Sequence, residues 1–150
     1  HTNIMCTYLK NTERYNHDRN FGCSKEISLL GAIQNRFGRA LAVSPGRFAR
    51  YDYVCSSCVV ELKTRRCKQD TYPDTMVGAN KIENMLLENR RCYCVFSFID
   101  GDFFVEITPD VVKLFRRGYG GRKDRGQNEQ QMYHFIPVSL LSPLGPSDDM

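Results

Sequence analysis

The sequence predicts a mixed domain of the α/β (α+β) class, in which a central mixed sheet is flanked by helices. Two observations support this class. Segments with helical periodicity alternate with strand-like runs along the chain, and four of those runs form two pairs joined by short turns. The 150 residues suit one domain, and a composition of 41% hydrophobic and 25% charged residues is that of a globular protein.

Periodicity and turn residues define each element in order. The first helix is expected to begin at the N-cap Ser24 and to end before Gly38, where a left-handed cap is favoured. The expected segments are an arm at 1–22, a helix at 24–37, a strand at 41–43, a hairpin of strands at 51–55 and 58–64, a polar loop at 65–78, a helix at 80–89, a hairpin of strands at 93–99 and 103–107, a short helix at 109–115, a basic Gly-rich loop at 118–131, a last strand at 133–141 and a tail at 145–150. The core of this single domain, 1–150, spans about 24–107.

The hairpin at 51–64 carries the candidate chemistry. If it closes about its two central serines, Asp52 lies opposite Glu61, with Cβ atoms about 5 Å apart, and Lys63 projects from the same face. Opposed like charges are destabilising unless a cation lies between them. Carboxylate oxygens with retained waters are the ligands that Mg²⁺ or Mn²⁺ prefers, and the Leu62 carbonyl can add another. Lys63 would then stand beside a metal-bound water.

These residues resemble the pattern of the PD-(D/E)XK nuclease superfamily: Asp52, then Glu61-Leu62-Lys63 on the next strand, after a helix that carries Glu26. The superfamily includes restriction endonucleases, Holliday-junction resolvases and cap-snatching endonuclease domains. The resemblance implies a restriction-endonuclease-like core and metal-dependent hydrolysis of phosphodiester bonds. It implies that Asp52 and Glu61 bind Mg²⁺ or Mn²⁺ and that Glu26 contacts the metal or its water. It also implies that Lys63 positions the nucleophile.

The resemblance further implies a nucleic-acid partner, with DNA favoured over RNA and cleavage of the endonuclease or junction-resolvase type. Many members of the superfamily act as dimers, so a homodimer is one expected arrangement. Lys81 falls on the helix after the motif, where some branches place a phosphate contact. The other basic residues that we expect to bind nucleic acid are Arg47, Arg50, Arg65, Arg66, Lys68, Arg116, Arg117, Arg122, Lys123 and Arg125.

Other interpretations of the same residues stay open. The hairpin charges can decorate a solvated face, and an acid such as Glu26 is favoured in the first turn of a helix by the helix dipole. A zinc ion can staple a binding or assembly module without catalysis, through Cys55, Cys58, Cys92 and Cys94. Cleavage of RNA, or a nuclease-like fold that only binds, are further alternatives.

Compartment is indicated by the cysteines and by the chain's hydropathy. The cysteine count of seven is odd, and no secretion signal is visible, so a reducing, intracellular setting, cytoplasmic or nuclear, is expected. No run approaches the ~18 apolar residues of a transmembrane helix, and no membrane partner is expected. The net charge of +4 is compatible with nucleic acid but does not require it.

Overall fold

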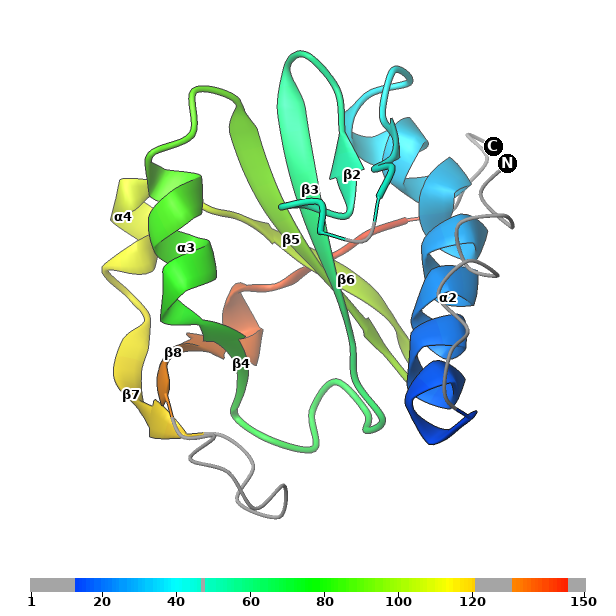
Figure 1. Ribbon diagram of the computed structural model, residues 1–150. Coiled ribbons are helices and arrows are strands. Elements are labelled where there is room, and N and C mark those ends of the chain that lie inside the picture. Colours follow the sequence, from blue (N-terminus) through cyan, green and yellow to red (C-terminus); the bar gives the residue numbers. More distant parts are fainter. Residues whose placement is uncertain (1–12, 47, 121–130, 146–150) are drawn as a thin grey trace.

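The computed structural model describes residues 13–46, 48–120 and 131–145, and for 13–23 it describes the backbone alone. A large sheet lies between α2 on one side and α3 on the other (Figure 1). The elements are α2 (Glu13–Phe37), β1 (Ala42–Val43), β2 (Tyr53–Val54), β3 (Cys58–Thr64), β4 (Asp74–Gly78), α3 (Ala79–Leu86), β5 (Arg91–Phe98), β6 (Gly101–Glu106), α4 (Pro109–Val112), β7 (Arg116–Gly120), β8 (Gln131–Pro137), a 3₁₀ turn (Val138–Leu140) and β9 (Ser142–Pro143).

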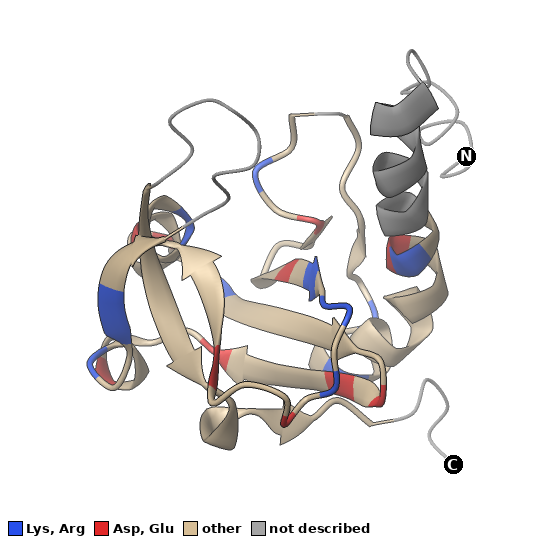
Figure 2. Ribbon diagram, turned by 90° about the horizontal axis from the view of Figure 1, so that it is seen from below, with Lys and Arg blue, Asp and Glu red and all other residues tan. Residues whose placement is uncertain are grey.

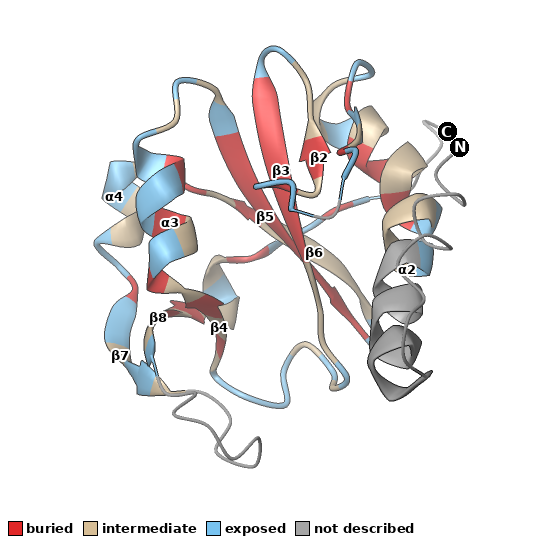
Figure 3. Cartoon of the chain, viewed as in Figure 1, coloured by how far each residue is buried: buried red, intermediate tan, exposed pale blue. Residues whose placement is uncertain are grey.

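The larger sheet has the strand order β1-β2-β3-β5-β6-β9 and is mixed. β3 pairs with β5 in parallel, from Cys58 opposite Arg91 to Thr64 opposite Ser97, whereas the other neighbours are antiparallel. The two parallel strands lie at the centre and are buried along most of their length (Figure 3). Burial on both faces explains why they read as continuous apolar runs in the sequence.

The alternation of side chains along β3 and β5 divides the core into two layers. On one face, Val60 of β3 packs in a cluster with Ile33 of α2. On the other face, Val59 packs in a cluster with Ile82 and Met85 of α3. A second sheet, of strand order β4-β8-β7, closes this second layer beside α3. Any polar side chain at an odd-numbered position of β3 therefore points toward α3.

The predicted fold class is confirmed, and so are both hairpins. β2 and β3 pair in the expected register, with Tyr53 opposite Val60 and Val54 opposite Val59. β5 and β6 form the second hairpin, and α3 falls inside the predicted helix at 80–89 apart from its first residue, Ala79. These elements rely on local signals, namely alternation of apolar residues and turn residues, which the sequence carries directly.

The first helix is longer than predicted, because α2 begins at Glu13 and Ser24 lies inside it as an ordinary helical residue. The interior Gly22 is tolerated, since one glycine costs a helix only about 1 kcal/mol. The left-handed cap is also wrong: positive φ angles among the described glycines occur at Gly46, Gly101 and Gly145, and not at Gly38. No helix of the described ranges, α2 included, is both long and apolar enough to cross a membrane.

The second sheet corrects two predicted loops. The polar loop at 65–78 contains β4, and the Gly-rich loop at 118–131 begins inside β7 and ends at the first residue of β8. These strands are short and pair with distant partners, so local patterns do not mark them. The arm at 1–12, residues 121–130 and the tail at 146–150 lie outside the described residues.

Candidate active site

Asp52 stands where the pairing of β2 with β3 stops being regular. Its backbone N–H donates to the Val60 carbonyl at 3.1 Å, and its carbonyl accepts from the Ser44 N–H at 2.9 Å. Its side chain turns to β3, where Oδ2 accepts the Leu62 N–H at 2.7 Å. The predicted backbone pair of Asp52 with Glu61 is therefore not part of the ladder, which ends at Tyr53 and Val60. A backbone amide, and not strand pairing, holds the Asp52 carboxylate beside β3.

Glu61 is a buried acid in the centre of β3, with 6% of its surface exposed. Lys63 Nζ lies 3.4 Å from Glu61 Oε2, and Lys81 Nζ lies 3.4 Å from Glu61 Oε1. Acidic and basic positions also lie side by side near the centre of the view in Figure 2. The prediction that Lys63 shares a face with Glu61 is confirmed by this contact. A buried carboxylate is expensive unless it is paired, and here each oxygen has an ammonium partner.

Lys81 reaches the site from α3. The helix follows β4 without a loop, and Ile82 and Met85 hold it against the sheet through the second core layer. The Lys81 ammonium donates to the Arg50 carbonyl and lies 5.1 Å from the centroid of the Tyr51 ring. These contacts hold an amine, one quarter exposed, beside Glu61.

Glu26 joins the site from α2. The Tyr53 hydroxyl donates to the Glu26 carbonyl at 2.7 Å and so ties this turn of α2 to β2. Burial, the charge of Asp52, a hydrogen bond with Asp52 and the charge of Glu61 together raise the pKa of Glu26 to about 8. This raised pKa favours the protonated form of the Glu26 carboxyl at neutral pH. Tyr53 was not foreseen as a site residue, although a buried tyrosine always needs a partner for its hydroxyl.

The electrostatics of Glu61 follow the same pattern. Burial and the charge of Asp52 raise its pKa, while Lys63 and Lys81 oppose that rise. Three acids thus interact in one small region, which is the condition that a divalent cation relieves. Within the described ranges, no group of three or more His, Cys, Asp and Glu side chains is arranged to enclose a metal ion. The donor chemistry fits a hard cation, although the carboxylates do not yet converge on one point.

The basic residues predicted to contact nucleic acid are distributed around the fold. Arg65 is largely enclosed: its Nε donates to Thr75 Oγ1 at 2.8 Å and its Nη2 to the Met76 carbonyl at 2.5 Å. Arg50, Arg66 and Lys68 are exposed near the ends of the hairpin strands. On β7, Arg116 forms an ion pair with Asp74 at 3.6 Å and Arg117 with Glu83 at 3.3 Å. Arg47, Arg122, Lys123 and Arg125 lie outside the described residues.

The zinc alternative is wrong on geometric grounds. Cys58 belongs to the core layer on the α2 side, whereas Cys92 and Cys94 belong to the layer on the α3 side. Thiols on opposite faces of a sheet cannot bind one ion. Cys92 instead donates to the carbonyls of Met85 and Arg90, and Cys94 contacts Met85 Sδ. These two behave as buried free thiols.

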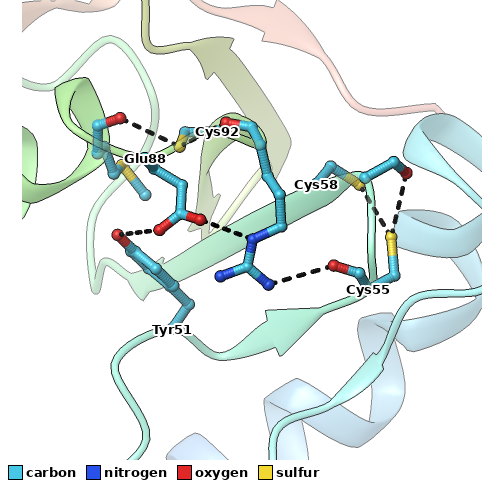
Figure 4. A network of polar contacts seen from close by, with 8 residues as sticks. Tyr51, Cys55, Cys58, Glu88 and Cys92 are labelled. Carbon is cyan, nitrogen blue, oxygen red and sulfur yellow. Dashed lines mark hydrogen bonds and ion pairs between the residues drawn. The ribbon is translucent and has the colours of Figure 1, made fainter.

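The turn of the β2–β3 hairpin is joined to the end of α3 by a polar network (Figure 4). Arg90 Nε donates to Glu88 Oε2 at 2.7 Å, and Arg90 Nη1 donates to the Cys55 carbonyl at 3.2 Å. The Tyr51 hydroxyl and Glu88 Oε1 lie 3.5 Å apart. Beside this network, the sulfur atoms of Cys55 and Cys58 lie 3.5 Å apart. The network fixes the hairpin that presents Asp52 relative to the helix that presents Lys81.

Comparison with known proteins agrees with this arrangement. No curated protein and no solved structure matches the chain. The profile of one family, described as "phage putative PDDEXK endonuclease", matches residues 39–144, which include Asp52, Glu61, Lys63 and Lys81. Because this match covers more than half of the chain and coincides with the acids and lysines gathered on β3 and α3, the chain belongs to this PD-(D/E)XK endonuclease family.

Proposed function

We propose that the protein is an endonuclease that uses Mg²⁺ or Mn²⁺ to hydrolyse phosphodiester bonds in DNA. The observation that carries this proposal is the buried Glu61 carboxylate, held between Lys63 and Lys81 and interacting with Asp52. An apolar residue would fill a central strand position at lower cost than a buried acid with two amines. Strongly perturbed acids grouped with lysines are typical of catalytic sites.

The carboxylates that would hold the cation are Asp52 and Glu61, with Glu26 contributing directly or through water. Such a cation, when bound, polarises the phosphate and lowers the pKa of a water ligand. The Leu62 N–H orients Asp52 for this role, and the Leu62 carbonyl is a further candidate ligand. The proton that Glu26 carries in the cation-free protein would leave as the cation binds, because the cation compensates the charges that raise its pKa.

The two lysines would act on the phosphate and on the attacking water. Lys63, with 35% of its side chain exposed, is placed to orient the water that attacks phosphorus. Lys81 is placed to bind a non-bridging phosphate oxygen, since its ammonium is held by the Arg50 carbonyl and faces the same carboxylate. The new bond joins the water oxygen to phosphorus, and the water gives up one proton to solvent. The bond from phosphorus to the leaving oxygen breaks, and that oxygen takes up a proton from solvent.

Basic residues from several parts of the chain would hold the nucleic-acid backbone. Single phosphate contacts by exposed lysines and arginines give affinity that falls steeply with salt. The proposed contacts are Arg47, Arg50, Arg65, Arg66, Lys68, Arg116, Arg117, Arg122, Lys123 and Arg125. A homodimer belongs to the same proposal, because two such sites would let one complex cut both strands of a duplex without dissociating.

The test replaces Lys63 by alanine. Lys63→Ala is expected to keep the fold and the Mn²⁺ affinity while cleavage falls by ~10²-fold or more, because the attacking water is no longer positioned. The measurement is cleavage of linear, circular and branched DNA and of single-stranded DNA and RNA, with and without Mn²⁺. Lys113→Ala is the matched control, since the Lys113 side chain is 77% exposed and its ion-pair partner Asp110 is 97% exposed.

Two outcomes would contradict the proposal. Cleavage by Lys63→Ala at the rate of the unaltered protein would remove Lys63 from the reaction. Cleavage of RNA with no cleavage of any DNA would leave a nuclease but overturn the assignment of the substrate.

A further inference from the structure

A preformed pocket lies next to the proposed catalytic strand, on the same face as Glu61 and Lys63. Its volume is about 430 Å³. We propose that it receives one unstacked base of the nucleic-acid substrate, and this inference rests on the proposed nuclease function. The residues that carry the argument are Arg65, Lys68, Tyr72, Met76, Phe98 and Phe135.

The position of the pocket follows from the geometry of β3. The Arg65 N–H donates to the Ser97 carbonyl at 2.8 Å, so the strand geometry continues one residue past Thr64. In an extended strand Glu61, Lys63 and Arg65 then project from one face, with Lys63 and Arg65 about 7 Å apart at Cα. Arg65 confirms this direction, since its guanidinium lies 5.6 Å from the centroid of Phe96 in the α3-side layer. The pocket therefore begins one side-chain position beyond the proposed catalytic lysine.

The lining of the pocket suits a flat, partly apolar group. Its lining is mostly apolar and includes the rings of Tyr72, Phe98 and Phe135 and the side chain of Met76. Tyr72 lines the pocket and is 62% exposed, so the face of its ring is available to a ligand. Aromatic side chains of this kind stack on bases with little regard for base identity.

The charge at the rim suits a nucleotide better than an uncharged ligand. Arg65 donates to the Thr75 hydroxyl and the Met76 carbonyl, both neutral acceptors, so these bonds leave its positive charge uncompensated. Lys68 adds a second cation, while the acid at the rim, Asp74, is paired with Arg116. A second depression of about 410 Å³ shares Arg65 and Phe98 with the first and is lined by Lys25 and Arg66. This basic depression gives the phosphates beside the base a path along the protein.

The walls of the pocket are fixed before any ligand binds. The Gln69 N–H donates to Asp100 Oδ1 at 2.9 Å, and Gln69 Nε2 donates to the Val138 carbonyl at 3.2 Å. The Val138 N–H donates to the Pro73 carbonyl at 3.0 Å. These bonds hold the loop at 65–73 against the turn between β5 and β6 and against the segment after β8. A pocket that is already formed takes its ligand without the cost of ordering a loop.

Occupation of this pocket has a consequence for the substrate. A base inside an intact duplex is paired and stacked, so it must first be extruded, which costs free energy. A base in a single strand, a frayed end or a branch point is already available. The protein is therefore expected to bind DNA with unpaired bases more tightly than blunt duplex DNA of the same length.

The test measures binding separately from cleavage. Fluorescence anisotropy in EDTA gives the Kd for a single-stranded oligonucleotide and for a blunt duplex of equal length. Tyr72→Ala is expected to raise the single-strand Kd about tenfold and to leave the duplex Kd within about twofold. Tyr72→Phe keeps the ring and is expected to retain the single-strand affinity. Tyr119→Ala is the matched control, because Tyr119 is 74% exposed on β7 and lies outside the pocket.

The two proposals fail in different ways. A single-strand Kd that Tyr72→Ala leaves unchanged, or that rises equally for Tyr119→Ala, would overturn the base pocket even if the protein cleaves DNA. A preference for single strands that depends on Tyr72, in a protein that cleaves nothing with Mn²⁺, would support the pocket and count against the proposed catalysis alone.

Discussion

The β2–β3 and β5–β6 hairpins of the larger sheet each close through a short turn, but their strand pairing differs in regularity. In the β5–β6 hairpin every residue from Tyr93 opposite Glu106 to Phe98 opposite Gly101 is paired. In the β2–β3 hairpin the ladder ends after Tyr53 and Val60. The β5–β6 hairpin fills the core with aromatic side chains, whereas the β2–β3 hairpin places a buried acid and its two lysine contacts at its centre. We therefore expect stability to depend mainly on β5–β6 and the proposed chemistry to depend mainly on β2–β3.

The largest effect is expected from breaking the regular hairpin. Phe96 is fully buried in the α3-side layer, so Phe96→Ala is expected to lower the free energy of unfolding by about 3–5 kcal/mol. Urea unfolding followed by circular dichroism measures this loss. Leu114→Ala, at a position 60% exposed, serves as the control and should change stability by less than about 0.5 kcal/mol. Equal losses for the two variants would contradict the structural role of this hairpin.

The second prediction separates chemistry from stability at β3. Glu61→Gln is expected to lower cleavage by ~10²-fold or more and to remove the heat of Mn²⁺ binding in calorimetry, because a carboxylate ligand is lost. The free energy of unfolding should change by less than about 1 kcal/mol, because the substitution also removes a buried charge. Glu106→Gln makes the same change in the other hairpin, where Glu106 pairs with Arg91 at the surface. Retained Mn²⁺ heat in Glu61→Gln would exclude Glu61 as a ligand.

The smallest effect concerns the turn of the β2–β3 hairpin. Burial raises the pKa of Cys55, but hydrogen bonds from Ser57 and Cys58 outweigh it and bring the pKa down to about 7. Burial together with Cys55 raises the pKa of Cys58 to about 11. Alkylation of Cys55 by iodoacetamide should therefore be half-maximal near pH 7 and level off above that pH, since the thiolate is the reacting form. Alkylation of Cys58 should still be increasing at pH 9.

Mass spectrometry of alkylated peptides from single-cysteine variants measures the two rates. Cys58→Ala retains Cys55 and removes the Cys58 thiol that contacts it, so the midpoint for Cys55 should move to higher pH. A Cys55 midpoint near 9 in the unaltered protein would show that the turn does not stabilise its thiolate.

The parts of the site that the sequence predicted are those encoded by local pattern. Asp52, Glu61 and Lys63 lie within one hairpin, so strand alternation and turn position were enough to bring them together. The register of that hairpin was predicted correctly. The position of the Asp52 side chain was not predicted. It accepts the Leu62 N–H, and such a bond from a backbone amide to a side chain leaves no mark in the alternation of apolar residues.

The parts that were missed depend on distant residues. β4 pairs with β8, from Asp74 opposite Pro137 to Gly78 opposite Tyr133. Burial alternates along β4, but apolar and polar residues do not alternate in the sequence of either segment. The four cysteines form two close pairs, as in a zinc site, but spacing alone does not say on which face of the sheet each thiol lies. Side-chain alternation along β3 and β5 decides that question, and it could have been applied once the parallel pairing of β3 with β5 was known.

That parallel pairing also sets the order in which the protein can become active. Glu61 lies opposite Cys94, so the strand that carries the acid is supported on its second side only when the chain has been made through β5. Parallel pairing over a long crossover is slow, because the loop must close before any contact forms. During synthesis, a nascent chain that ends before Arg91 lacks the parallel partner of β3. We therefore expect the proposed site on β3 to reach its buried arrangement only after β5 has been made.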